Sequence, residues 1–238
     1  MVKGKRIDLD CENCAVKDIS KFRVLNEEGA KSLSYHKTCT RYRKGQVLFH
    51  EGTRPLGVFC INGGKVKIYR TGYDGKEQII HIGKGGDLLG YKALISEEVY
   101  PVTAETLEEC DICFIPKSEF VHLMDENSKL GKLLLREACH ELSEMTELVT
   151  NLAQKPVRER LAVALLMLKE TYGLDGRSES ERIEINLTRE DLANIIGTAT
   201  ETLIRLLHDF KEEKIIETQG RKIRVIDDKL LEKVAHLY

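Results

Sequence analysis

Residues 188–207 read Thr188-Arg-Glu-Asp-Leu-Ala-Asn-Ile-Ile-Gly197, followed by Thr198-Ala-Thr-Glu-Thr-Leu-Ile-Arg-Leu-Leu207. Each half begins with a threonine that has an acidic residue three positions later, Asp191 or Glu201, and this is the spacing of a capping box at a helix start. Gly197 between the halves can adopt the positive φ that a tight turn requires. The stretch therefore predicts a helix-turn-helix.

The second predicted helix has two contrasting faces. Four apolar residues share one side of the helical wheel and are expected to face a core: Leu203, Leu206, Leu207 and Phe210. The opposite side carries Glu201, Ile204, Arg205 and His208. An exposed isoleucine fits a DNA major groove, where it can touch a thymine methyl while arginine binds guanine and glutamate accepts from cytosine. An ordinary i,i+4 salt bridge between Glu201 and Arg205 is the alternative.

The residues around this motif predict the rest of a winged domain. A helix is expected from Val157 to about Tyr172, followed by a polar loop over 173–181 and a strand over 183–187. Alternating residues over 215–226, interrupted by Gln219-Gly220, predict a hairpin. Its tip carries three basic residues that suit contacts to DNA phosphates: Arg221, Lys222 and Arg224.

Residues 40–116 predict a β-sandwich or β-roll. Short apolar runs, such as Val58-Phe-Cys-Ile61 and Ile112-Cys-Phe-Ile115, alternate with glycine-containing turns. Strands at near-regular spacing with such turns are typical of these architectures. Asp74-Gly75 is a strong hairpin signal within this region.

Beyond Pro116 the apolar period changes to that of a heptad helix. The stripe starts at Gly131 and continues through six further positions: Leu135, Ala138, Leu142, Met145, Val149 and Leu152. Spacings that alternate between four and three predict a parallel dimer seam. The alternative is a helix that packs on its own domain.

Composition narrows the class of protein. The 238 residues are 42% apolar, and the longest apolar run, 161–168, is far shorter than the roughly 20 residues that span a bilayer. The charged start leads into no apolar run, so we expect no secretory signal, no membrane partner and a cytoplasmic location. The net charge of −2 does not by itself indicate nucleic acid. We find no phosphate loop, nucleophile elbow or zinc-protease pair in the sequence, and therefore expect no enzyme.

Over nearly its whole length the chain resembles the Crp/Fnr family of transcription regulators. The resemblance rests on four segments: Lys44-Gly45 through Glu51-Gly52, Asn62-Gly-Gly-Lys-Val66, Gly86-Asp-Leu-Leu-Gly90 and, most specifically, Thr188–Leu207. It implies a homodimer on a palindromic DNA site with a TGA half-site core, a β-roll sensor, and RNA polymerase as a partner. It also implies that Glu201 and Arg205 read bases while Arg189 contacts a phosphate.

Together these features predict an α+β fold in four parts. They are an N-terminal segment with a Cys-x-x-Cys pair (1–22), a double-stranded β-roll sensor like a cyclic-nucleotide-binding jelly roll (23–120), a long dimerisation helix (121–154) and a winged helix-turn-helix (155–238). The predicted DNA contacts are Arg189, Thr198, Thr200, Glu201, Ile204, Arg205, Arg221 and Lys222. A ligand-binding sensor module that acts through protein contacts instead of DNA is the alternative function.

The chain departs from the cyclic-AMP receptors of this family. Those receptors carry an arginine for the nucleotide phosphate shortly after the Gly-Asp/Glu-Leu turn, and the matching position here falls near Tyr100. No Arg or Lys occurs between Lys92 and Lys117. A buried phosphate without a cation is poorly stabilised, so we expect cyclic AMP not to bind.

Three of the seven cysteines are similar in position to ligands of the oxygen-sensing Fnr branch. That branch holds an iron–sulfur cluster with three N-terminal cysteines and one central cysteine. By resemblance Cys11, Cys14 and Cys113 are cluster ligands, whereas the remaining N-terminal position is Ser20. Because such clusters take four thiolates, the fourth ligand would come from elsewhere, such as Ser20 itself or Cys39.

Other roles for the cysteines stay open. An odd number in a chain that looks intracellular favours thiols or metal ligands over disulfides. Zinc would need Cys110 beside Cys113, but residues three apart on a strand point to opposite faces. No metal, a redox disulfide, or haem on His81 are further alternatives. Cys60 and Cys139 lie in apolar runs and are expected to be buried, unreactive packing. The sequence does not identify the effector.

Overall fold

The computed structural model of the protein describes residues 5–11, 13–173 and 183–236. This described chain divides into two compact units. The first comprises the described residues up to Arg70 together with Ile80–Glu144, and the second comprises Thr71–Ile79 and the described residues from Met145 onward. None of the described helices is long and apolar enough to cross a membrane.

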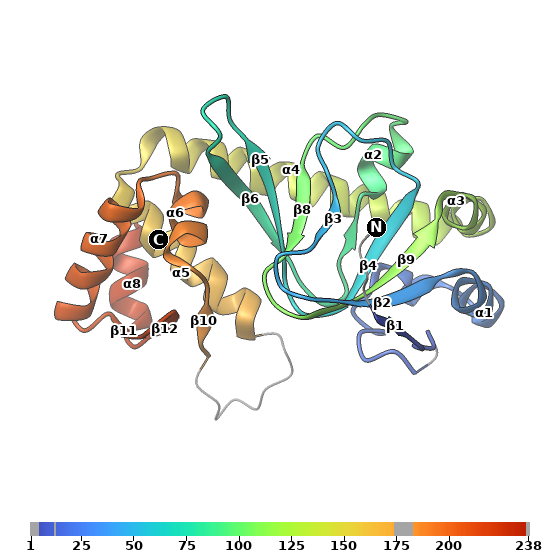
Figure 1. The fold of residues 1–238 in the computed structure, drawn as a ribbon, viewed down its shortest axis with the longest axis horizontal. Coiled ribbons are helices and arrows are strands. Elements are labelled where there is room, and N and C mark those ends of the chain that lie inside the picture. The colour runs from blue at the N-terminus through green and yellow to red at the C-terminus, as the bar shows by residue number, and fades with distance from the viewer. Residues whose placement is uncertain (1–4, 12, 174–182, 237–238) are drawn as a thin grey trace. The chain divides into compact units, whose positions relative to one another are not determined.

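The first unit is built on two sheets, which Figure 1 shows in blue to yellow-green. Among the described residues, one sheet has the order β1-β2-β9-β4-β7: Lys5–Ile7, Thr38–Tyr42, Cys110–Pro116, Gly57–Gly63 and Leu88–Leu89. The other has the order β3-β8-β5-β6: Val47–Phe49, Thr103–Thr106, Val66–Thr71 and Glu77–Gly83. Two sheets of short strands confirm the predicted β-roll.

The apolar runs of these strands form the core that the sequence predicts. Ile61, Val66, Ala104 and Ile112 are fully or almost fully buried in one cluster. The Asp74-Gly75 turn joins β5 to β6, and Gly75 has a φ of 79°. That left-handed conformation explains why glycine occupies the turn.

Helices cover part of this β-roll. They are the 3₁₀ helix η1 (Lys21–Val24), α1 (Glu27–His36), α2 (Tyr91–Ile95), α3 (Lys117–Glu126) and α4 (Ser128–Gln154). Leu33 of α1, Phe120 of α3 and Leu130 of α4 are buried in one cluster with the strand residues Val58 and Ile115. This cluster fixes the N-terminal helices against the face of the sheet that carries β4 and β9.

Helix α4 is 27 residues long and leaves one stripe of its surface open. Leu135, Leu142 and Val149, which are spaced by seven, are 67%, 68% and 65% exposed. The positions between them, Ala138, Met145 and Leu152, are partly exposed. In the single chain, therefore, the predicted stripe is not covered by the chain's own core.

The second unit contains the predicted helix-turn-helix. Its elements are α5 (Val157–Gly173), β10 (Ile185–Asn186), α6 (Arg189–Ile196), α7 (Thr200–Glu212), β11 (Ile216–Gln219), β12 (Lys222–Val225) and α8 (Asp228–Ala235). The strands pair in the order β10-β12-β11 within the described part of the unit, so the predicted hairpin is present. Most of the predicted polar loop lies outside the described residues.

One of the two predicted capping boxes is confirmed and the other is wrong. Thr188 accepts a hydrogen bond from the Asp191 backbone N–H and caps α6. Gly197 follows with a φ of 65°, as the tight turn requires. The Thr198 N–H then donates to the Ala193 carbonyl. Thr198 is therefore still part of the turn, and α7 begins after Ala199 without a side-chain cap.

Candidate DNA-reading helix and cysteine pocket

Helix α7 separates its side chains into the two predicted faces. Leu203, Leu206, Leu207 and Phe210 are at most 9% exposed and belong to the core of the second unit. On the other side Glu201, Arg205 and His208 are exposed, and Ile204 is 52% exposed. No ion pair or hydrogen bond joins Glu201 to Arg205 among the described residues, so the alternative of an i,i+4 salt bridge is not observed.

The wing turn is tied to the start of α6 by Arg189. Its guanidinium donates to the carbonyl of Gly220 at 3.0 Å and to that of Arg221 at 3.5 Å. Partial burial lowers the pKa of Arg189. These bonds hold the tip of the β11–β12 hairpin beside the helix-turn-helix, and Arg221 itself is exposed at that tip.

The other two wing cations have acidic partners. Lys222 Nζ lies 2.6 Å from Glu184, and Arg224 Nη2 lies 2.9 Å from the same carboxylate. Lys222, and then Arg224, hold the pKa of the Glu184 carboxyl below its ordinary value. Lys222 remains half exposed, whereas Arg224 also pairs with Glu217. Arg221 is therefore the wing cation that the structure leaves most open to a phosphate.

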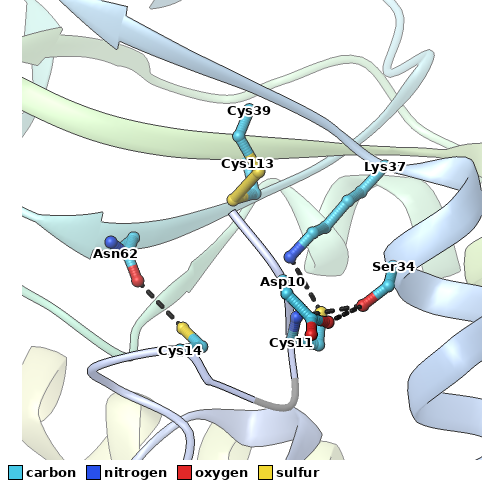
Figure 2. Close-up of a disulfide and its surroundings, with 8 residues drawn as sticks. All are labelled: Asp10, Cys11, Cys14, Ser34, Lys37, Cys39, Asn62 and Cys113. Carbon is cyan, nitrogen blue, oxygen red and sulfur yellow. Dashed lines mark hydrogen bonds between the residues drawn. A yellow bond between two sulfur atoms is a disulfide. The ribbon is translucent and has the colours of Figure 1, made fainter. Parts of the chain in front are cut away.

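The first unit holds a pocket that gathers cysteines from distant parts of the chain. Among the described residues its lining includes Cys11, Cys14, Cys60 and Cys113. Lys37 donates to Cys11 Sγ at 2.9 Å, and the Cys14 thiol donates to Asn62 Oδ1 at 2.9 Å (Figure 2). The Cys11 N–H donates to Ser34, which in turn donates to Asp10. The Cys-x-x-Cys loop is thus fastened to both α1 and β4.

Cys113 is bonded to Cys39 in a disulfide (Figure 2). The two residues are directly opposite in the register of β2 and β9, and Cys60 is directly opposite Cys113 in the register of β4 and β9. Directly opposite residues of an antiparallel pair project from the same face of the sheet. Cys39, Cys113 and Cys60 therefore form a row across three adjacent strands.

These positions correct two expectations about the cysteines and confirm a third in part. The prediction of thiols in preference to disulfides is wrong for Cys39 and Cys113, because strand pairing places them opposite each other. Cys60 is partly buried and packs against the apolar cluster of α1, α3 and α4, so this expectation is confirmed in part, but Cys60 also lines the pocket. Cys139, on the open side of α4, is exposed and not buried. Apolar neighbours in sequence indicated burial, but the strand register and the helix face decide it.

The remaining cysteine, Cys110, belongs to another environment. It lies three residues before Cys113 on the continuous strand β9, and its thiol donates to the Lys65 carbonyl at 3.3 Å. Burial raises the pKa of this thiol to about 12. The alternation of the strand thus separates Cys110 from the pocket, as the sequence predicts, and removes the four-cysteine zinc arrangement.

Comparison with known proteins places both units in one family. Residues 39–127 match the model of the cyclic nucleotide-binding domain, and residues 159–234 match that of the Crp-like helix-turn-helix domain. The chain is 30% identical over 220 residues to the anaerobic regulatory protein of Haemophilus influenzae, an alignment that covers 92% of this chain and 85% of the relative. The chain belongs to the Crp/Fnr family. It is a DNA-binding transcription regulator, and homodimers and inverted-repeat sites are typical of this family.

Other relatives lie within the Fnr branch of the Crp/Fnr family. The fumarate and nitrate reduction regulatory protein of Vibrio cholerae is 28% identical over 228 residues, covering 95% of this chain and 90% of that protein. The fold is shared with FixK2 of Bradyrhizobium japonicum (22% identity, 83% of this chain, 96% of that chain, TM-score 0.73). It is also shared with a Crp/Fnr structure from Eubacterium rectale (21% identity, 90% and 97%, TM-score 0.72).

The Fnr-branch relationship raises the question of whether the pocket suits an iron–sulfur cluster. Its donors suit one, since thiolates are the ligands that such clusters take and cysteines from four places line the pocket. As the structure stands, no three Cys, His, Asp or Glu side chains of the described residues form a metal-holding group. Cys113 is also occupied by Cys39. The donor set therefore fits a cluster only after this disulfide is reduced.

The region around Tyr100 is where the sequence resemblance leads us to expect the phosphate-binding arginine of cyclic-AMP receptors. Tyr100 is 4% exposed, stacks on Phe49 at 3.9 Å between ring centroids, and donates through its hydroxyl to the Gly57 carbonyl. Burial raises the pKa of Tyr100 to about 12. The side chain is thus a neutral part of the core and supplies no cation there.

Proposed function

We propose that this Crp/Fnr regulator reads DNA with the exposed face of α7 and responds to oxygen through an iron–sulfur cluster in its cysteine pocket. The observation that carries the DNA-reading part is the unpaired Glu201-Ile204-Arg205 surface on a helix whose other side is fully committed to the core. In this arrangement Arg205 binds a guanine, Glu201 accepts from a cytosine amino group, and Ile204 contacts a thymine methyl.

The other predicted DNA contacts surround this surface. Thr198 lies in the turn before α7 and Thr200 is the first residue of α7, where hydroxyl groups and backbone N–H groups suit phosphate oxygens. Arg221 and Lys222 lie at the wing, and Arg189 links the wing to α6 through its two carbonyl contacts. In this proposal phosphate contacts set the position of α7, and base contacts set the sequence.

The proposed dimer uses the open stripe of α4, where Leu135, Leu142 and Val149 repeat at heptad spacing. A parallel pair of such helices buries a and d positions against each other. Two recognition helices related by a twofold axis then require an inverted repeat with half-sites about one helical turn apart. The proposed half-site core is TGA.

The proposed signal follows from the cysteine pocket. Cys11, Cys14 and Cys113 would hold the cluster, which supplies chemistry that is sensitive to oxygen. Two relatives carry names that refer to anaerobic regulation and to fumarate and nitrate reduction, which supports a signal of this kind. We extend the proposal to a cytoplasmic location, to RNA polymerase as a partner, and to the four-part division at residues 22, 120 and 154.

A mobility-shift titration tests the DNA-reading part. The probe is a duplex with two TGA half-sites as an inverted repeat, and the control is the same duplex with one half-site reversed into a direct repeat. Supporting results are preferential binding to the inverted repeat and an affinity that falls with rising salt. Equal, salt-independent retention of both duplexes would instead favour a sensor module that acts through protein contacts.

Anaerobic purification tests the signal. A cluster gives visible absorbance together with iron and acid-labile sulfide, and both are expected to be lost in air. Protein that takes up neither iron nor sulfide after reduction and anaerobic reconstitution would remove the cluster from the proposal while leaving DNA reading intact.

A further inference from the structure

The cluster in the proposed function lacks one thiolate. Cys11, Cys14 and Cys113 supply three, and the position that would supply the fourth by resemblance is Ser20. Three side chains near Cys113 and the Cys-x-x-Cys loop are candidates for the missing ligand: Ser20, Cys39 and Cys60. The two other cysteines are excluded by position, because Cys110 lies on the opposite face of β9 and Cys139 lies on α4.

Ser20 and Cys39 are poorly suited to this role. Ser20 lines the pocket, but its hydroxyl donates to the Lys17 carbonyl at 3.1 Å, and a hydroxyl is a harder ligand than the thiolates that iron–sulfur clusters select. Cys39 is 4% exposed and is not among the residues that line the pocket. It flanks Cys113 from β2, whereas the strand residues that line the pocket come from β4 and β9.

Cys60 meets both conditions, whereas Ser20 and Cys39 each meet only one. It is a thiol, and it lines the same pocket as Cys11, Cys14 and Cys113. It flanks Cys113 directly in the strand register, and two residues along the same strand Asn62 accepts from the Cys14 thiol at 2.9 Å. One strand therefore both presents Cys60 and holds the Cys-x-x-Cys loop above it.

We propose that Cys60 is the fourth thiolate ligand of the iron–sulfur cluster, so that Cys11, Cys14, Cys60 and Cys113 form the complete set. This inference rests on the proposed cluster and assigns its last ligand to a position on β4 instead of the N-terminal segment. Lys17, Arg23 and Lys37 also line the pocket, and their positive charge offsets the negative charge of four thiolates.

Four single variants test the assignment, each measured after reduction and anaerobic reconstitution. Cys60→Ser and Cys60→Ala remove the proposed ligand. Cys39→Ser is the matched control, because Cys39 flanks Cys113 on the other side in the same row of the sheet. Cys139→Ser controls for loss of an exposed thiol. The readouts are iron and acid-labile sulfide per chain, visible absorbance, and the thermal unfolding of the metal-free protein.

We expect both Cys60 variants to lose most of the iron and sulfide that the unmodified chain holds, because such clusters take four thiolates, with wild-type content in Cys39→Ser and Cys139→Ser. Metal-free Cys60 variants should unfold at temperatures close to that of the metal-free parent. A double variant, Cys60→Ser with Ser20→Cys, returns a thiol to the same pocket and should recover the cluster, which separates loss of a ligand from loss of the fold.

Three results would contradict the proposal. Wild-type iron and sulfide content in either Cys60 variant would overturn the assignment while leaving the cluster in place. An equal loss in Cys39→Ser would also overturn it, because any change in this row would then have the same effect. An unmodified chain that takes up no iron, or that takes up only zinc, would overturn the cluster itself and this ligand with it.

Discussion

At the scale of single residues, α7 separates stability from recognition. Its buried leucines and Phe210 hold the helix in the second unit, whereas Glu201, Ile204 and Arg205 contribute nothing to that core. Exposed substitutions away from special contacts usually change stability by less than about 0.5 kcal/mol. Changes on this face are therefore expected to alter DNA binding without unfolding the protein.

Replacing Arg205 with alanine removes the proposed guanine contact. We expect a loss of about 1–3 kcal/mol in binding free energy per half-site and a relaxed preference at one base pair. Binding-site selection followed by titration of single-base variants measures both effects. His208→Ala is the control, since His208 is exposed on the same helix but lies outside the predicted contact set. An Arg205→Ala protein with unchanged base preference would contradict the role of this residue.

Replacing Arg221 with alanine is expected to act differently. Arg221 lies at the exposed tip of the wing, where it would contact a phosphate and no base. Affinity should fall by a similar factor for every sequence, and the slope of log affinity against log salt should become shallower by about one per subunit. Lys229→Ala in α8 provides a control cation. A loss confined to one DNA sequence would show that Arg221 reads a base.

At the scale of elements, α4 is the part of the fold that a single chain leaves incomplete. Three large apolar side chains at heptad spacing are about two-thirds exposed. Isolated exposed apolar residues are common on protein surfaces, but a stripe of them along 27 residues of helix is typical of an interface. This face is therefore where a second copy of the chain is expected to pack.

Replacing Leu142 with glutamate tests that interface. The change places two like charges in the seam of a parallel dimer, so the dimer should dissociate at concentrations where the unmodified chain stays paired. Ser143→Glu adds the same charge one residue off the stripe and should leave the dimer intact. Sedimentation of the metal-free proteins measures the outcome. An unchanged dimer in Leu142→Glu would place the interface elsewhere.

At the scale of the whole molecule, the β-roll matches the cyclic nucleotide-binding domain, but we expect it not to bind cyclic AMP. The Tyr100 region offers a stacked aromatic ring and a hydroxyl already bonded to Gly57 where a phosphate would need a cation. We expect calorimetry to show no binding of cyclic AMP at micromolar concentration. Micromolar affinity would mean that a cation from another part of the chain serves the phosphate.

The two fates of Cys113 are mutually exclusive, because its one sulfur atom cannot be both bonded to Cys39 and a cluster ligand. The disulfide is the state that the structure shows. Cluster assembly therefore has to start from the reduced protein, in which Cys113 and Cys39 are thiols. The proposed cluster can therefore form only when the disulfide between Cys39 and Cys113 is reduced.

Local sequence patterns predicted most of the fold and the DNA-reading face. In the wheel of α7, the Thr188 cap and the Gly197 turn, each residue is at most four positions from its next partner, so these signals are readable in sequence. The second predicted capping box is wrong. Thr198 and Glu201 have the spacing of a capping box, but Thr198 still lies in the turn that follows α6.

The cysteine pocket could be predicted only in part. Cys11 and Cys14 are adjacent in sequence, and the family resemblance identifies Cys113. The place of Cys60 depends on the register of β4 against β9, which is set by pairing between residues about 50 positions apart. No local pattern encodes that register. The apolar run around Cys60 predicts burial, and Cys60 is partly buried. The run does not predict which cavity Cys60 lines.

The exposed stripe of α4 also ties the stability of this regulator to its abundance. If a second copy covers Leu135, Leu142 and Val149, unfolding releases two chains, and mass action makes the folded fraction depend on total protein. Each tenfold dilution would then lower the free energy of unfolding by about 1.4 kcal/mol per dimer, so the melting temperature would fall as the protein is diluted. A cell holding few copies would carry a larger unfolded fraction, and DNA, which binds the pair, would counteract this by holding two chains together.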